Sequence, residues 1–345
     1  MITTSRILWI DLMKGILLTF ICLSHFGDLP RFIVYLVQPT SCFWVPLFFI
    51  LSGYLFSVKK DFISYLKHKT RSLLVPYVLF SICFILLDLQ TYTDKGYLIS
   101  NLQRIFYEGI GPYKASPLWF VWVLFGASLL SYLILKNCRN NALRIIIGVA
   151  LSLVCYLLSS YELHPPYMLS IILSATVFIL IGYWTKQINE RIKNRPVITY
   201  VLILFGLWGV IGMIFVPLGD FHFNIIKYYP LFYLLPAWFG FSCVCILEKL
   251  DNMTLQKNYL ANCLIWVSQN GLTILAAHVY LVFAFNFFAE KMQLFFSNAV
   301  SFILKLIFVF MALYLFVVPF INTYCYRFIN HKKTTWKENY KFIGK

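Results

Sequence analysis

Apolar stretches of about twenty residues follow one another along the whole chain, separated by short breaks that carry proline, glycine or charge. An α-helix of that length crosses the hydrocarbon core of a bilayer. The pattern predicts ten spans, near residues 7–27, 39–57, 72–90, 117–135, 143–161, 167–184, 197–217, 228–247, 263–285 and 299–325. We therefore expect an all-α, polytopic integral membrane protein with a basic tail at 327–345 and no separate soluble domain.

The composition favours a membrane protein over a large soluble domain. Of the 345 residues, 61% are hydrophobic and only 12% are charged, whereas soluble domains carry about 25% charged residues. The nine cysteines are scattered, mostly inside apolar stretches, so we expect neither a disulfide framework nor a metal site. The first apolar stretch contains charged residues and is not followed by a small-residue cleavage site, which argues against a cleavable signal peptide.

The lysines and arginines predict the orientation in the membrane. Most of the 29 lie in the two termini and in the breaks at 58–71, 136–144, 186–195 and 249–257. Because cytoplasmic loops carry the excess of positive charge, both termini are expected in the cytoplasm. The net charge of +16 is then explained by topology and by contact with anionic lipids, not by nucleic-acid binding. The opposite loops hold only Arg31, Lys95, Arg104, Lys114, Lys227 and Lys291.

The first stretch, 7–27, is unusual because Asp11, Lys14 and His25 interrupt its apolar sequence. At 100° per residue, Lys14 and His25 differ by about 20° in direction and lie roughly 16 Å apart along the axis. Asp11 falls within about 60° of Lys14. Ionisable groups at membrane depth cost about 2.5–3.5 kcal/mol each, so one helix face is expected to be functional. Alternatively, Asp11 and Lys14 form a snorkelling pair at the cytoplasmic mouth.

The three residues have separate expected roles. A histidine can act as a general base on a hydroxyl, because its ordinary pKa lies near neutrality. We interpret His25 as that base and Lys14, three turns nearer the cytoplasm, as a site for an anionic group. Asp11 would pair with Lys14 and hold it in position. The basic segment 58–71 is either a topology signal that contacts anionic lipids or a landing site for a phosphorylated cytoplasmic ligand.

Other candidate residues stand in later spans. Arg71 precedes Tyr77 at the start of the third span, where an arginine serves as a topology anchor or in phosphate recognition. Ser52, next to Gly53 in the second span, favours close helix packing or a local bend. Trp119 lies near the start of the fourth span at the outer surface, where aromatic residues are common.

The ninth span holds Asn270 and His278 in an apolar context. The two residues are about 80° apart around a helix, so they can border the same cavity. A histidine within the membrane can also serve only as a hydrogen-bonding group between helices. No role is expected for His68, His164, His222 and His331, which fall in basic segments or external loops.

Five motifs, in this order, resemble membrane acyltransferase family 3, and most closely its fucose O-acetylase-like bacterial branch. They are W-I-D-x-x-K-G with a histidine eleven residues after the lysine, P-L-F-F-I-x-S-G-Y, R-x-x-x-x-P-Y, L-W-F-x-x-x-L and S-x-N-G-x-x-x-x-x-x-H. The resemblance covers nearly the whole chain, residues 1–326, including the ten-span layout. That family commonly carries arginine ahead of the histidine. Lys14 stands there in this chain, which keeps the charge but loses bidentate geometry.

The resemblance implies an enzyme of the bacterial inner membrane that transfers an acyl group from cytoplasmic acyl-CoA, usually acetyl-CoA, with no bound cofactor. The acceptor would be a hydroxyl of a cell-envelope glycan or lipid-linked sugar. The implied residues are His25, Asp11 and Lys14 for catalysis, Arg71, Tyr77 and Lys14 for acyl-CoA binding, and Ser52, Trp119, Asn270 and His278 for an acceptor or acyl pocket.

Two alternatives stay open at this stage. One is O-succinyl transfer in exopolysaccharide synthesis, which no sequence feature separates from acetyl transfer. The other is a transporter or flippase for a lipid-linked sugar, a class that often shows internal repeats, of which this sequence has none. Ser24 points about 100° away from His25, so a serine nucleophile is not expected. The acceptor, the oligomeric state and the existence of a covalent acyl-enzyme are left open.

Overall fold

The computed structural model describes residues 7–27, 29–37, 42–88, 95–192, 194–215, 218–250, 252–294, 296–327, 334–335 and 338. Within these ranges the chain is almost entirely helical, with one antiparallel hairpin of β1 (Gly219–Asp220) and β2 (Ile225–Ile226). The expected helical fold is therefore confirmed, with this hairpin as an addition. The predicted start of the second span at 39–41, the end of the third at 89–90 and most of the tail at 327–345 lie outside the described residues.

The helical elements follow one another in chain order, with π-helical or 3-10 segments where a helix changes pitch. They are α1 (Leu8–Ser24), α2 (Arg31–Val37), α3 (Trp44–Tyr54), α4 (Phe62–Lys69), η2 (Thr70–Leu74), α5 (Val75–Asp88), α6 (Lys95–Gln103), η3 (Arg104–Glu108), η4 (Tyr113–Leu118), α7 (Trp119–Asn137), α8 (Asn141–Ser160), α9 (Leu169–Ile192), α10 (Pro196–Phe215), α11 (Leu231–Leu247), α12 (Asn252–Lys257), α13 (Tyr259–Gln269), α14 (Gly271–Lys291), α15 (Asn298–Ala312), η5 (Leu313–Val317) and α16 (Val318–Tyr324).

Six helical segments of the described chain are long and apolar enough to cross a membrane, which agrees with a multi-pass protein. They are Phe62–Asp88, Lys95–Asn137, Asn141–Ser160, Leu169–Ile192, Gly271–Lys291 and Asn298–Tyr324. Three shorter apolar helices, Trp44–Tyr54, Pro196–Gly206 and Leu231–Leu247, fall within other predicted spans. The count of ten spans and the orientation of the termini stay predictions.

Two segments fold differently from the sequence prediction. Residues 62–69, expected in a basic loop, form α4, which continues through η2 into α5. Asp61 caps this helix by accepting a hydrogen bond from the Ser64 N–H at 2.9 Å, and that bond holds the pKa of Asp61 below its usual range. The predicted ninth span is divided into α13 and α14, which meet at Asn270.

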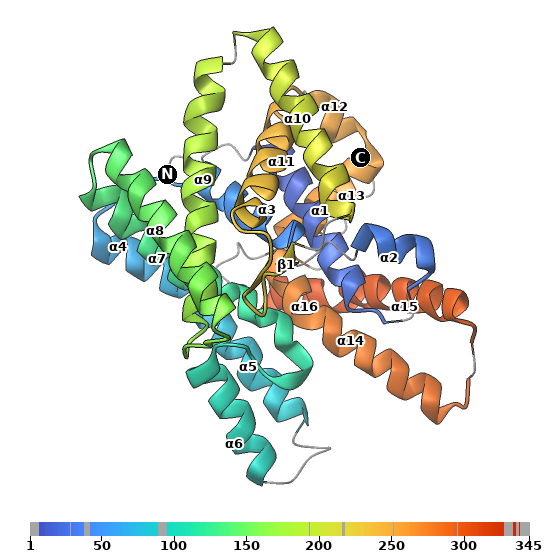
Figure 1. Cartoon of the computed structure of the whole chain (residues 1–345). Coiled ribbons are helices and arrows are strands. Elements are labelled where there is room, and N and C mark those ends of the chain that lie inside the picture. The colour runs from blue at the N-terminus through green and yellow to red at the C-terminus, as the bar shows by residue number, and fades with distance from the viewer. Residues whose placement is uncertain are drawn as a thin grey trace.

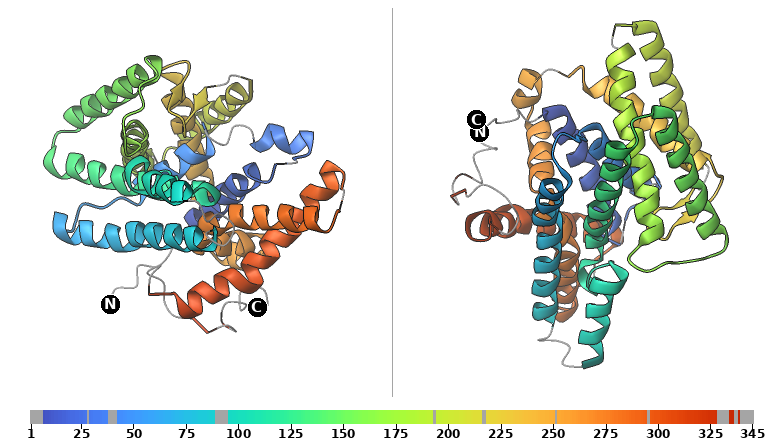
Figure 2. Two further views of the ribbon diagram at one scale, coloured as in Figure 1. Left: turned by 90° about the horizontal axis from the view of Figure 1, so that it is seen from below. Right: turned by 90° about the vertical axis from the view of Figure 1, so that its left-hand side faces the viewer.

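Glycines bring the central helices into backbone contact. A Cβ on Gly53 of α3 would strike the Ile179 carbonyl of α9, and a Cβ on Gly182 of α9 would strike the Ile50 carbonyl of α3. Gly15 packs α1 against the backbone of α13 in the same way. Small residues permit this close approach between helices in a membrane. Consequently α1 and α3 are held in the middle of the molecule, between α7–α11 and α13–α16 (Figure 1). Seen from below, α14 and α15 lie on the side away from α7 and α8 (Figure 2).

A buried ion pair fixes the segment η4 beside the central helices. The Lys114 ammonium lies 2.7 Å from one oxygen of Asp88, whose side chain is almost fully buried. The Tyr97 hydroxyl donates to the other Asp88 oxygen at 2.7 Å, and the Lys114 ammonium lies 5.9 Å from the Tyr280 ring centroid. These contacts join α5, α6, η4 and α14. They therefore position Ser116, which follows Lys114 by two residues, next to the cavity described below.

Candidate active site

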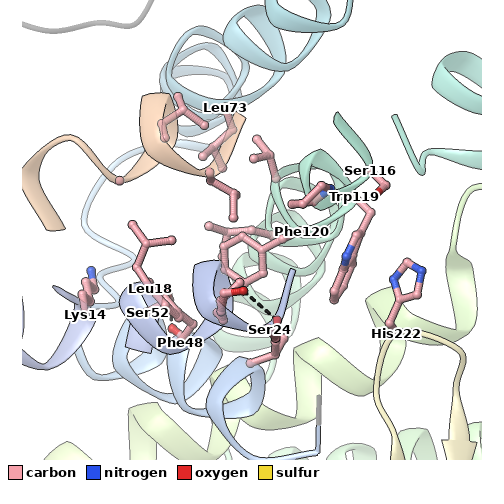
Figure 3. A pocket seen from close by; sticks show the side chains of 18 of the residues that line it. Lys14, Leu18, Ser24, Phe48, Ser52, Leu73, Ser116, Trp119, Phe120 and His222 are labelled. Atoms are coloured by element: carbon pink, nitrogen blue, oxygen red, sulfur yellow. Dashed lines mark hydrogen bonds between the residues drawn. The ribbon is translucent and has the colours of Figure 1, made fainter. Parts of the chain in front are cut away.

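A cavity of about 670 Å³ lies among α1, α3, η2, η4, α7, the β1–β2 hairpin, α13 and α14. Most of its wall is apolar, and polar groups gather toward its ends. Figure 3 shows Lys14 at one end and Ser116, Trp119 and His222 at the other. A large apolar cavity with a few converging polar groups is the usual form of a small-molecule site. The polar and charged lining residues are Lys14, Ser24, His25, Ser52, Ser72, Ser116, Asp220, His222, Ser268 and Gln269.

Helix α1 brings Lys14 and His25 to the same cavity, as expected for residues on one helix face. The helix ends at Ser24, and His25 is the capping residue, whose N–H bonds to the Cys22 carbonyl at 3.1 Å. The His25 side chain is exposed, and the space it borders is the cavity. Asp11 is not among the lining residues. Its carboxylate accepts a hydrogen bond from the Ser268 hydroxyl of α13 at 3.4 Å, so it joins α1 to α13 one turn from Lys14.

The His278 ring packs beside the His25 ring. The two imidazole centroids are 5.3 Å apart, with the ring planes tilted by 54°. His278 is fully buried on α14, and its Nδ1 lies 2.9 Å from the Ile274 carbonyl. A carbonyl only accepts, so Nδ1 of His278 carries the proton and Nε2 is an acceptor. This Nε2 is buried and has no hydrogen-bond partner among the described residues. His278 therefore carries a buried acceptor nitrogen on a ring that packs beside the His25 ring.

The β1–β2 hairpin places an acid and an imidazole at the same end of the cavity. Asp220 accepts hydrogen bonds from the N–H groups of His222 at 2.8 Å and Phe223 at 3.3 Å, which shapes the turn. The His222 ring packs 4.6 Å from the Trp119 ring, and both line the cavity. Burial lowers the pKa of His222, while the Asp220 charge opposes that shift.

His222 and Asp220 are among the lining residues that sequence reasoning missed. His222 was expected to have no role, because it follows a predicted span in what looked like an external loop. The hairpin folds back over the cavity instead. Its two-residue strands are too short to give a periodic signal. Gly219, Asp220 and Asn224, which are common turn residues, indicate only that a turn lies here.

The remaining predicted residues divide into those on the cavity wall and those beside it. Ser52 and Trp119 line the cavity, and the Ser52 hydroxyl donates to the Phe48 carbonyl at 2.8 Å. Asn270 stands at the break between α13 and α14, where it donates to the Trp266 carbonyl and accepts from Asn322. Its neighbours in the sequence on both sides line the cavity, so Asn270 supports the wall from behind.

The two residues assigned to acyl-CoA binding besides Lys14 are not on the wall. Arg71 is exposed on η2, and the next residue, Ser72, lines the cavity. Tyr77 is fully buried, and its hydroxyl donates to the Ile105 carbonyl of η3 at 3.0 Å. In the described part of the chain, no group of three or more His, Cys, Asp and Glu residues is arranged to hold a metal ion.

The two ends of the cavity can do different chemistry. At one end, His25 can take a proton from a hydroxyl, while the Trp119 indole N–H can donate a hydrogen bond. At the other end, Lys14 is the one cationic residue among the described lining residues. An anion bound there would be attracted by its charge. The cavity is thus suited to a long ligand with an anionic end and a reactive end.

Comparison with known proteins agrees with these features. The model of a protein family described as an acyltransferase domain matches residues 7–330. The nodulation protein NolL of Mesorhizobium japonicum is similar to this chain, with 29% identity over 138 residues. That match covers 36% of this chain and 34% of NolL, so it spans about a third of each protein. No solved structure matches the chain.

Proposed function

Because the chain belongs to the acyltransferase family whose domain covers residues 7–330, we propose that it is a membrane O-acyltransferase. It moves an acyl group, acetyl in the first place, from cytoplasmic acyl-CoA to a hydroxyl of a cell-envelope glycan or a lipid-linked sugar. Succinyl is the second acyl group to test. The placement in the bacterial inner membrane with both termini in the cytoplasm is part of the proposal.

One observation carries the proposal: a single cavity borders both Lys14 and His25. Three helical turns, roughly 16 Å, separate these residues along α1. The extended pantetheine arm of CoA, which links its phosphates to its thioester, is of comparable length. Lys14 would bind a phosphate, while the thioester carbon would lie near His25. Arg71, one residue from the wall at Ser72, would reach the phosphates that remain outside.

The proposed reaction is a direct transfer. A neutral ring nitrogen of His25 takes the proton of the acceptor hydroxyl as its oxygen attacks the thioester carbon. The new C–O bond forms, the carbonyl becomes an oxyanion, and the C–S bond then breaks to release CoA thiolate. The proton passes from His25 to the thiolate, which leaves as CoA-SH. Trp119 and His222, at the same end of the cavity, are two side chains that can donate to the oxyanion.

Ser24 argues for a direct transfer over an acyl-enzyme. Its hydroxyl donates to the Ile21 carbonyl of its own helix at 2.6 Å, although the residue lines the cavity. A serine held in this way is not paired with His25, as an activated nucleophile would be.

The test is acetyl transfer from labelled acetyl-CoA to the glycan of native membranes, comparing wild type, His25→Ala and Ser24→Ala. Loss of a general base lowers the rate by about 10²–10⁴-fold, so His25→Ala should lose almost all transfer. Ser24→Ala should retain it. Thermal stabilisation by CoA in all three proteins shows that they are folded and bind the donor.

Three outcomes would contradict parts of this proposal. Transfer by His25→Ala at the wild-type rate would remove His25 as the base. Loss of transfer in Ser24→Ala would support a covalent intermediate. A folded wild type that is neither stabilised by CoA nor active would favour the transporter alternative.

A further inference from the structure

A second cavity, of about 510 Å³, meets the first one at His25. Both cavities are bordered by His25 and Ser116, and no other residue that the structure describes lines both. The second cavity does not reach Lys14, so it lies away from the proposed phosphate end. Its lining residues are His25, Phe26, Gly27, Tyr113, Ser116, Val279, Val282, Phe283, Asn286 and Lys305.

The second cavity is lined by buried residues on one side and by exposed residues on another. Val282 of α14 and Lys305 of α15 are buried, whereas Phe283 and Asn286 of α14 are exposed. The Lys305 ammonium donates to the Phe26 carbonyl at 3.3 Å, which fixes the residue next to His25. A molecule entering beside Asn286 would therefore pass the buried residues Val282 and Lys305 before it reaches His25.

The chemistry of the second cavity fits a sugar ring. Aromatic faces at Tyr113 and Phe283 can pack against the C–H face of a pyranose, and Asn286 and Ser116 can bond its hydroxyls. Tyr113 is held in place: its ring stacks on the Arg104 guanidinium at 4.2 Å, and its hydroxyl bonds with that of Ser100 at 3.1 Å. A preformed aromatic platform reduces the ordering cost of binding.

The surroundings of the exposed side also suit an amphipathic molecule. Asn286 lies in the second-last turn of α14, a helix long enough to span a membrane, and so near one of its ends. The next two residues, Phe287 and Phe288, are 62% and 60% exposed. The exposed rings and the neighbouring polar amide together offer both an apolar and a polar surface near the end of this span.

We propose that the second cavity is the acceptor subsite and binds a sugar ring of the molecule that is acylated. This inference rests on the proposed acyl transfer. The donor occupies the first cavity from Lys14 to His25, the sugar occupies the second, and His25 stands between the thioester and the sugar hydroxyl. The two substrates approach the base from different sides, so neither has to leave before the other enters.

The test fills part of each cavity separately, by placing a larger side chain on its wall. Val282 lines only the second cavity and Val45 lines only the first, and both are buried. Val282→Trp and Val45→Trp are therefore a matched pair. Each variant is measured for apparent affinity for CoA in a thermal shift, and for transfer of labelled acetyl from acetyl-CoA in native membranes.

Val282→Trp should keep its CoA affinity within about threefold and lose at least tenfold in transfer, whereas Val45→Trp should lose both. Asn286→Ala, which changes little volume, should lower transfer while sparing CoA affinity, and it decides the matter if Val282→Trp does not fold. Wild-type transfer by a folded Val282→Trp or by Asn286→Ala would overturn the acceptor subsite. Wild-type membranes that bind CoA but incorporate label from neither acetyl-CoA nor succinyl-CoA would refute the acyl transfer itself.

The same labelled membranes distinguish the two sources of the sugar. Label that extracts with the lipids identifies a lipid-linked sugar, while label that stays with the insoluble polymer identifies a finished glycan. Both outcomes support a sugar in the second cavity when Asn286→Ala reduces them. Label found only on protein or free glycerol would contradict it.

Discussion

Replacing Lys14 tests whether the donor's anionic end lies at that end of the cavity. Lys14 is partly buried and lines the wall. A hydrogen bond from a charged group contributes about 1.5–3 kcal/mol net, and each 1.4 kcal/mol is a factor of about ten in affinity. Lys14→Ala should therefore weaken CoA binding by about 10- to 100-fold.

The assay compares two ligands that share the thiol arm. CoA carries the phosphates and pantetheine lacks them, so calorimetric titration of both isolates the phosphate contribution. Lys14→Ala should weaken CoA binding and leave pantetheine binding unchanged. Lys14→Arg should bind CoA within about threefold of wild type, because the charge is retained. Lys59→Ala, an exposed lysine outside the cavity, is the matched control.

Two results would refute this reasoning. An equal loss for CoA and pantetheine in Lys14→Ala would mean that the substitution distorts the cavity and removes no phosphate contact. Unchanged CoA affinity would mean that the phosphates bind elsewhere.

Three further predictions follow from contacts described above. His278→Ala should lower turnover more than CoA affinity, because the His278 ring packs beside His25 and does not line the proposed donor cavity. A fall in affinity alone would contradict this. Gly53→Ala should lower the thermal midpoint, because overpacking costs about 1–3 kcal/mol. Gly148→Ala should not, because a Cβ added at Gly148 meets only ordinary van der Waals contacts. Equal midpoints for the two variants would refute the close packing at Gly53. Burial depresses the pKa of His222, so the stability that this residue contributes is present above the unfolded-state pKa and is lost as pH falls below it. Between pH 7.5 and 5, the thermal midpoint of His222→Asn should therefore fall less than that of wild type. Parallel curves for the two proteins would contradict the assignment.

The sequence predicted much of the fold because hydrophobic length is a strong signal in a membrane protein. It also placed Lys14 and His25 correctly on one wall, since a helix face is fixed by residue spacing alone. The alternation of apolar and basic residues did not distinguish α4 from a loop, because its charged face is exposed and its cap is one side chain, Asp61. The break at Asn270 was also missed, although it falls on the pair Asn270-Gly271, a dipeptide that is common in turns.

The rest of the site depends on contacts between distant parts of the chain. His222 reaches Trp119 only because the hairpin folds back, and Lys305 reaches the end of α1 from almost 280 positions away. Tyr77 shows the opposite case. Its motif suggested ligand binding, but its hydroxyl holds η3 instead. Pair contacts at such separations leave no periodic trace in a single sequence.

The reciprocal glycine contact between α3 and α9 has a consequence for acyl-chain selectivity. Val45, Phe48 and Ser52 of α3 face the cavity, while Gly53 faces the backbone of α9. The distance between the two helix axes thus sets how far this wall stands from α1. A bulkier residue at Gly53 would push α3 toward α1 and shorten the room for the acyl tail. We expect the preference for short or long acyl donors to be governed by this backbone spacing, so that a change of chain length can arise from a residue that no donor touches.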